Sequence, residues 1–164
     1  MTIISRWGLA IVAGALALSF NASAQERHYR FAHDQQLNSG YSVAYDIFSA
    51  KLKELSGGKM LVDQYPGAQL GQEPQLLQLV KSGDLDFAIV SSANTATISP
   101  QAGVMSLHFL FRGEDHMVKA LADPQVFEAI RDMIDQTVQG IHVIGLGTQG
   151  LRNMYSKREI RKIE

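Results

Sequence analysis

The sequence predicts an α/β fold in which a parallel sheet is covered by helices. Short runs of alternating or continuous apolar residues are interleaved with longer runs in which apolar residues recur every three or four positions. The first pattern is typical of strands and the second of helices. Their order along the chain is strand, helix, strand, helix, strand, which favours parallel strands joined by helical crossovers.

The first three elements are expected between residues 28 and 65. His28–His33 has the composition of a short strand, and Ser39–Leu55 has helical spacing with Asn38 or Ser39 as its cap. Met60–Tyr65 alternates apolar and polar residues and is the second strand. The helix is expected to bury a single apolar stripe, formed by Ala44, Ile47, Phe48, Leu52 and Leu55.

A second helix and a third strand follow. Proline is favoured in the first turn of a helix because its missing N–H would be unpaired there, so we expect this helix to begin near Pro74. Lys81 complements the dipole at its end, and Gly83 is suited to the left-handed conformation that terminates helices. Leu85–Val90 is then a strand apolar enough to be buried on both faces.

The C-terminal half is expected to add two helices and one strand. Glu114–Ala122 and Pro124–Val138 have helical spacing, and Gly140 ends the second of them. Ile141–Leu146 then reads as a further buried strand. The second helix carries its apolar residues on one side, namely Val126, Phe127, Ile130, Met133 and Ile134.

Residues 1–24 have the three parts of a cleavable export signal. Arg6 is the positive charge, Trp7–Phe20 is the apolar stretch, and Ala22-Ser23-Ala24 supplies small residues before a cleavage point after Ala24. The alternative is a membrane-spanning helix, which needs about 20 apolar residues, more than this stretch provides. We therefore expect residues 25–164 to form one domain exported to the periplasm.

The composition narrows the possible functions. Lys and Arg number 15 against 16 Asp and Glu, a net charge of −1, which argues against a nucleic-acid partner because that would need a concentrated basic face. The chain has no cysteine, which excludes disulfides, a thiol nucleophile and a zinc–thiolate site. An exported domain of this size without disulfides suits a bacterial periplasm.

Polar side chains are expected to gather at the carboxyl ends of the strands, where open parallel sheets bind ligands. The residues that follow the expected strands are His33, Asp34 and Gln35, then Gln64–Gln69, then Ser91, Ser92 and Asn94, and finally Gly147, Gly150 and Arg152. Hydroxyls, amides and one arginine suit a polar, anionic small molecule. Arg152 is the strongest candidate because its planar guanidinium matches a carboxylate; the alternative is a surface arginine beside a turn.

The motifs of common enzymes are absent from the sequence. There is no Gly-x-Ser-x-Gly, no phosphate-binding glycine loop and no His-Glu-x-x-His. Gly145–Gly150 matches the dinucleotide pattern G-x-G-x-x-G, but neither an amphipathic helix nor an acidic partner follows it. Asp84 and Asp86 would share a strand face, yet turn chemistry explains them more simply than acid–base catalysis. We therefore expect no enzyme activity, no cofactor and no metal site.

Several short motifs occur in a characteristic order along residues 25–164. They are Tyr29–His33, Ser56-Gly57-Gly58-Lys59, Pro66, Gln69-Leu70-Gly71, Gly83–Phe87, the Leu107–Phe111 run and Gly150-Leu151-Arg152. Each motif alone is weakly specific. Their order and spacing together resemble the solute-binding proteins of tripartite ATP-independent periplasmic (TRAP) transporters, of the dicarboxylate-binding DctP type.

The resemblance implies a fold and a function. The fold would be that of type II periplasmic binding proteins, in which two α/β lobes close on an organic acid, either a dicarboxylate or a related carboxylate. The ligand would then pass to membrane permease subunits driven by an ion gradient. By matching position, the ligand cleft would be lined by Asp34, Gln72, Glu73, Ser91, Asn94 and Arg152.

Two features depart from the family pattern. His108 stands where the family usually has proline, and family members are considerably longer than this chain. We therefore expect residues 25–164 to form most of the first lobe, without the second lobe and without a further arginine that anchors the ligand. Three alternatives remain: a binding protein of an ATP-driven transporter, an exported α/β enzyme, and a non-functional remnant of the TRAP receptor.

Overall fold

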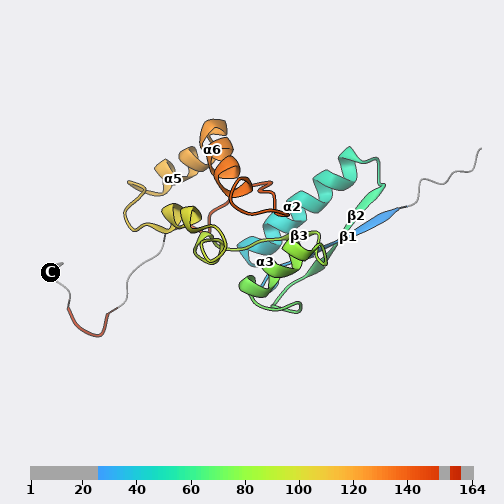
Figure 1. The fold of residues 1–164 in the computed structure, drawn as a ribbon, viewed down its shortest axis with the longest axis horizontal. Coiled ribbons are helices and arrows are strands. Elements are labelled where there is room, and N and C mark those ends of the chain that lie inside the picture. Colours follow the sequence, from blue (N-terminus) through green and yellow to red (C-terminus); the bar gives the residue numbers. More distant parts are fainter. Residues whose placement is uncertain (1–25, 152–155, 160–164) are drawn as a thin grey trace, which may run out of the picture.

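The computed structural model describes residues 26–151 and 156–159, and it contains a small parallel sheet with flanking helices (Figure 1). The elements in chain order are β1 (Arg27–Ala32), α2 (Gly40–Leu55), β2 (Met60–Tyr65), α3 (Glu73–Ser82), β3 (Phe87–Ala88), α4 (Ser92–Thr95), the 3₁₀ helix η1 (Pro100–Ser106), α5 (Glu114–Leu121) and α6 (Pro124–Asp135). The predicted α/β class is confirmed.

The three strands are parallel and lie in the order β2-β1-β3. β1 pairs with β2 along its whole length, from Arg27 opposite Met60 to Ala32 opposite Tyr65. β1 pairs with β3 only at its end, where Ala32 lies opposite Ala88. Because all strands run the same way, their carboxyl ends meet at one edge of the sheet.

The two crossover helices cover opposite faces of the sheet. Successive residues of a strand point to opposite faces, and Phe31 and Ala32 are successive. The Phe31 ring packs against Tyr45 and Phe48 of α2, with ring centroids 5.3 and 5.8 Å apart. Ala32 instead joins a core cluster with Leu76 of α3 and with Leu85. The sheet is therefore sandwiched between α2 and α3, as expected of right-handed crossovers that run in opposite directions.

The third strand is shorter than the sequence predicts. Leu85 is buried as expected, but only Phe87 and Ala88 pair with β1, and Phe87–Val90 are half-buried. The reason lies at Asp86, whose carboxylate accepts the backbone N–H of Arg30 at 2.8 Å. The N–H of Arg30 is therefore not available for backbone pairing with β3. The pairing of β1 with β3 begins only after Asp86.

The apolar stripe predicted for α2 is only partly correct. Ser39 caps the helix as expected, since its hydroxyl accepts the backbone N–H of Ser42 at 3.4 Å. Phe48 and Leu52 are half-buried, but Ile47 is 67% exposed, and Ala44 and Leu55 are also exposed. The helix turns Tyr45 and Phe48 toward Phe31, which rotates Ile47 away from the sheet.

The signals predicted at the ends of α3 are confirmed. Pro74 lies in its first turn, and Gly83 adopts a left-handed conformation with φ of 81° at its end. Leu76 is buried against Ala32 of the sheet, and Leu77 is buried against Val138 and Ile141. Pro74 fixes where α3 begins, and it therefore places Glu73 beside the carboxyl edge of the sheet.

The C-terminal half holds two helices that the sequence predicts and two short ones that it does not. The two predicted helices are α5 and α6, and they pack against each other (Figure 1). The prediction of a strand at Ile141–Leu146 is wrong, because this segment pairs with no strand in the described part of the chain. Its backbone is held by a side chain, since Asp135 accepts the N–H of Val143 at 3.1 Å. The short helices α4 and η1 were not predicted.

The export signal predicted at residues 1–24, with cleavage after Ala24, lies outside the described residues. Within residues 26–151, no helix has the length and apolar character needed to cross a bilayer.

Candidate functional site

Three of the residues predicted to bind a ligand, Glu73, Ser91 and Asn94, are in contact at the carboxyl edge of the sheet. His33 and Asp34 follow β1, and Ser91 follows β3, the strand beside it. Glu73 opens α3, which begins at the same edge after β2. Asn94 lies in α4, whose cap is Ser91. The strand-end rule therefore identifies a region where polar side chains converge.

Glu73 lies at the centre of this region. The residue is 4% exposed, and both of its carboxylate oxygens accept hydrogen bonds. Oε2 accepts the backbone N–H of Ser91 at 2.8 Å, the Ser91 hydroxyl at 2.6 Å and the Asn94 amide at 2.6 Å. Oε1 accepts the hydroxyl of Tyr41 at 3.1 Å. One carboxylate thus joins α2, α3 and α4.

The hydrogen bonds keep this buried carboxylate ionised. Burial by itself raises the pKa of Glu73, but the donors on Ser91, Asn94 and Tyr41 outweigh it and hold the pKa below its ordinary value. An unpaired buried charge would be strongly destabilising, whereas a carboxylate with several donors is stable in such a place. Glu73 therefore carries a negative charge at neutral pH.

A second buried cluster surrounds His33. The residue is fully buried, and its Nε2 lies 2.9 Å from the amide nitrogen of Gln64 and 3.4 Å from the hydroxyl of Ser42. The same Gln64 nitrogen donates to Ser42 at 3.0 Å. With Gln64 in this orientation, its nitrogen donates to Nε2 of His33, and the ring proton then lies on Nδ1.

The His33 ring is held in its neutral form. Burial lowers its pKa, and this outweighs the carbonyl of Gln35 and the charge of Asp34, which both favour protonation. Nδ1 is buried and makes no hydrogen bond of normal geometry within the described residues. Tyr41 packs edge-on against the ring with centroids 5.9 Å apart, so one tyrosine contacts both the His33 cluster and Glu73.

The other predicted residues differ in their surroundings. Asp34 is half-buried, and its carboxylate accepts the side-chain amide of Gln35 at 3.1 Å. Gln72 is exposed and caps α3 with its carbonyl, which accepts the N–H of Leu76 at 3.0 Å. Arg152 lies outside the described residues, so the structure does not place it.

The resemblance and the strand-end rule did not single out Tyr41, although it holds Glu73. The available signal is its position: Tyr41 lies in the first turn of a helix that begins where β1 ends. Gln64 belongs to a run that the rule did select, and its position at the end of β2 brings it beside His33.

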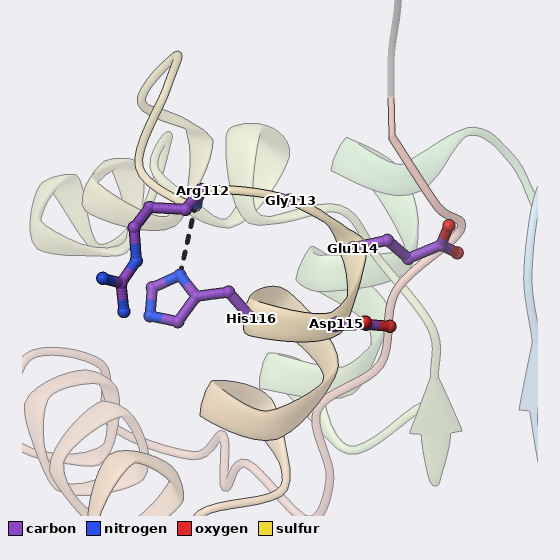
Figure 2. A pocket seen from close by; sticks show the side chains of 5 residues that line it. All are labelled: Arg112, Gly113, Glu114, Asp115 and His116. Atoms are coloured by element: carbon purple, nitrogen blue, oxygen red, sulfur yellow. Dashed lines mark hydrogen bonds between the residues drawn. The ribbon is translucent and has the colours of Figure 1, made fainter.

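A separate hollow of about 430 Å³ lies at the start of α5 and is lined by Arg112, Gly113, Glu114, Asp115 and His116 (Figure 2). His116 Nδ1 accepts the backbone N–H of Arg112 at 3.2 Å. Glu114 and Asp115 put two carboxylates at this end of the helix, which disfavours an anionic ligand. None of the predicted binding residues lines this hollow. In the part of the chain that the structure describes, no three acidic, histidine or cysteine side chains are grouped to hold a metal ion.

The chain belongs to a known family. Residues 31–164 match the model of the bacterial extracellular solute-binding proteins, family 7, also named DctP. The match begins near the end of β1, covers β2, β3 and all the helices, and includes the position of Arg152. Proteins of this family bind solutes, and the resemblance seen in the sequence is confirmed.

Individual relatives agree with this assignment. An uncharacterized protein, YiiZ of Salmonella typhimurium, is 34% identical over 122 residues, which are 74% of this chain and 37% of that protein. A TRAP periplasmic solute-binding protein of Xanthobacter autotrophicus with bound β-D-galacturonate is 31% identical with a TM-score of 0.62, covering 66% of this chain and 36% of that one. A third, from Citrobacter koseri with bound D-glucuronate, is 31% identical with a TM-score of 0.60, covering 65% and 35%. The chain thus spans well under half the length of these relatives.

Proposed function

We propose that this chain supplies the first lobe of a periplasmic receptor that captures an organic acid for a TRAP secondary transporter. The observation that carries the proposal is the convergence of Asp34, Glu73, Ser91 and Asn94 at the carboxyl edge of a parallel sheet, in a chain of the DctP family. Ligands of open α/β sheets bind at that edge.

The class of ligand follows from the solved relatives and from the sequence. Two relatives at 31% identity hold β-D-galacturonate and D-glucuronate, which are both small carboxylates. Arg152 is the proposed partner of the ligand carboxylate, because a guanidinium binds it with two parallel hydrogen bonds. Asp34, Ser91 and Asn94 would contact the rest of the ligand, with Gln72 at the margin and Glu73 behind them.

The proposed receptor would act in the periplasm together with membrane subunits. Export by residues 1–24 with cleavage after Ala24 would place the receptor in the periplasm. Membrane permease subunits would receive the ligand there, and closure of two lobes would retain it until then. The receptor would bind its ligand without converting it; the sequence contains none of the common enzyme motifs.

The test is ligand binding by the protein expressed from its complete reading frame. Isothermal titration calorimetry with D-galacturonate and D-glucuronate is expected to give saturable one-to-one binding. Arg152→Ala is expected to weaken it by at least about 100-fold, since a charge-assisted pair is lost. Arg158→Ala is the matched control because Arg158 is exposed, and it should bind as the unchanged protein does. Equal losses in both variants, or no binding of any organic acid, would refute the proposal.

A further inference from the structure

The buried His33 cluster consists of three groups whose hydrogen bonds can be reversed. Nε2 of His33 lies 2.9 Å from the amide nitrogen of Gln64 and 3.4 Å from the hydroxyl of Ser42, and the same nitrogen lies 3.0 Å from that hydroxyl. A side-chain amide can turn over and exchange its oxygen with its nitrogen, and a hydroxyl can either donate or accept. The same atomic positions can therefore hold two opposite patterns of hydrogen bonds.

The charge of the His33 ring decides between the two patterns. In the neutral ring, Nε2 accepts from the Gln64 amide, which also donates to Ser42. A proton added to Nε2 turns this atom into a donor, which cannot face the N–H groups of the amide. When the amide turns over, its oxygen takes the place of the nitrogen and accepts from both Nε2 and the Ser42 hydroxyl. No hydrogen bond is lost, which lowers the cost of placing a charge in this buried position.

The other end of the Gln64 amide reaches the surface. Gln64 is half-buried near the carboxyl end of β2, and its amide oxygen makes no hydrogen bond with any residue that the structure describes. Within the described residues, Nδ1 of His33 is the only buried side-chain nitrogen or oxygen without a partner, so the Gln64 oxygen is in contact with solvent. Turning the amide over puts its nitrogen in this place. The exposed atom then changes from an acceptor to a donor.

Two carboxylates lie near the His33 ring. Asp34 follows it directly in the chain, and its charge favours protonation of the ring. Glu73 of α3 lies beyond Tyr41 of α2, whose ring packs edge-on against His33. The partners from β2 and from the start of α2, an amide and a hydroxyl, carry no charge. Burial outweighs these influences and lowers the pKa of His33, so the ring accepts its proton at a pH below 6.5.

We propose that His33, Ser42 and Gln64 form a proton-operated switch, in which a proton on Nε2 of His33 turns the Gln64 amide over. The carboxyl edge of the sheet then presents a donor in acid and an acceptor at neutral pH. The effect of this switch on ligand binding rests on the proposed function. A donor and an added positive charge both favour a carboxylate, so an organic acid binds more tightly as the pH falls. By linkage, the ligand in turn favours the protonated ring.

The first test follows the switch by NMR in the protein from its complete reading frame, without ligand, between pH 7.5 and pH 4.5. The ring nitrogens of His33 should change from the form with one proton, on Nδ1, to the form with two. The side-chain amide signals of Gln64 should shift with the same midpoint. Gln64→Met removes the acceptor and should lower the midpoint of His33 by about one pH unit. Gln125→Met, at an exposed position of α6, is the matched control and should leave the midpoint unchanged.

Two results of this test overturn the inference. One is a His33 ring that keeps a single proton down to pH 4.5, and the other is a Gln64 amide whose signals do not follow the ring. An equal midpoint in a folded Gln64→Met protein also contradicts the switch. If that variant does not fold, the shared midpoint of His33 and Gln64 in the unchanged protein decides.

The second test measures the effect on binding by calorimetry with D-glucuronate at the two ends of the same pH range. The unchanged protein and Gln125→Met are expected to bind at least about fivefold more tightly at pH 4.5 than at pH 7.5, whereas Gln64→Met should show little difference. Equal affinity at both pH values, or the same gain in Gln64→Met, overturns the inference and leaves an organic-acid receptor in place. Binding of no organic acid at either pH refutes the proposed function, and the NMR test then decides whether the switch exists.

Discussion

The unit formed by residues 26–90 and the segment formed by residues 91–151 contain similar apolar patterns but use them differently. In the first, β1 pairs on both sides, and Ala32, Leu76 and Leu85 form a closed core. In the second, Val138 and Ile141 are buried against Leu77 of α3, whereas Leu107 is 60% exposed and Phe109 is 86% exposed. An apolar pattern becomes a buried element only where the chain supplies a surface to cover it.

Truncation of one leucine in each region should give the largest difference in the free energy of unfolding. Leu76→Ala removes a fully buried side chain between α3 and the sheet, and it is expected to lower the free energy of unfolding by about 2–5 kcal/mol. Leu107→Ala removes an exposed side chain of the same size and should cost less than about 0.5 kcal/mol. Urea unfolding followed by circular dichroism measures both. Similar losses in the two variants would mean that the contrast in packing is not real.

Loss of the Glu73 charge should destabilise the junction between the two regions. Glu73→Gln keeps the size of the side chain but cannot accept all four hydrogen bonds, and we expect a loss of about 1–3 kcal/mol at pH 7. Glu54→Gln should change stability little, because Glu54 is exposed and paired only with Lys51. Chemical unfolding of the three proteins at one pH gives the comparison, and an equal effect at both sites would contradict the central place given to Glu73.

Acid should lower the free energy of unfolding by protonating the Glu73 carboxylate. The folded state lowers the pKa of Glu73, so its stabilisation is fully present above the ordinary value of 4.5 and is lost as the pH falls from there toward the folded pKa. Stability measured from pH 6 to pH 3 should therefore fall less steeply in Glu73→Gln. Parallel curves for the two proteins would show that the carboxylate titrates normally.

His33 should add a smaller dependence at milder pH. Its folded pKa is lowered by burial, so the unfolded chain binds the proton first, and stability falls as the pH drops below the ordinary value of 6.5. Replacing the ring in His33→Asn removes this slope, whatever the stability of the variant at pH 7. The midpoint of thermal unfolding between pH 7.5 and pH 5.5 tests it, and a slope that persists in the variant must come from other groups.

The smallest effect is expected from a backbone change. Gly83 ends α3 with φ of 81°, where a side chain is strained, so Gly83→Ala should cost about 1 kcal/mol. Gly145 lies in the Ile141–Leu146 segment, which forms no strand, and it has open space around it and no left-handed φ, so Gly145→Ala should be close to neutral. Thermal unfolding compares the pair, and a neutral Gly83→Ala would mean that α3 does not depend on this terminator.

The sequence predicts the first region well because its signals are local. Ser39, Pro74 and Gly83 act within one helical turn of themselves, and the structure bears out the helix ends that they predict. The alternation in Met60–Tyr65 likewise needs only its own residues to be read, and β2 has those bounds. Long-range partners cannot be read in this way. Ile141–Leu146 has the composition of a strand but no neighbouring strand in the described residues, and the side that α2 buries is set by Phe31.

The candidate site likewise contains residues that the sequence predicts and residues that depend on long-range contacts. The strand-end rule selected Asp34, Ser91 and Asn94 because strand order alone brings these positions to one edge. The resemblance added Glu73, but its four donors come from α2, from α4 and from the cap of α4, and no spacing in the sequence encodes such a network. Tyr41 was not predicted for this reason, since its role depends on the placement of α2 over the start of α3.

The most direct test of the account is to locate the ligand on the protein. Backbone amide signals of the protein from its complete reading frame are followed by NMR during titration with D-galacturonate. We expect the largest shifts at Asp34, Ser91 and Asn94, on the carboxyl edge of the sheet, and none at the Arg112–His116 hollow. Shifts centred on Arg112–His116, with the carboxyl edge unchanged, would contradict it.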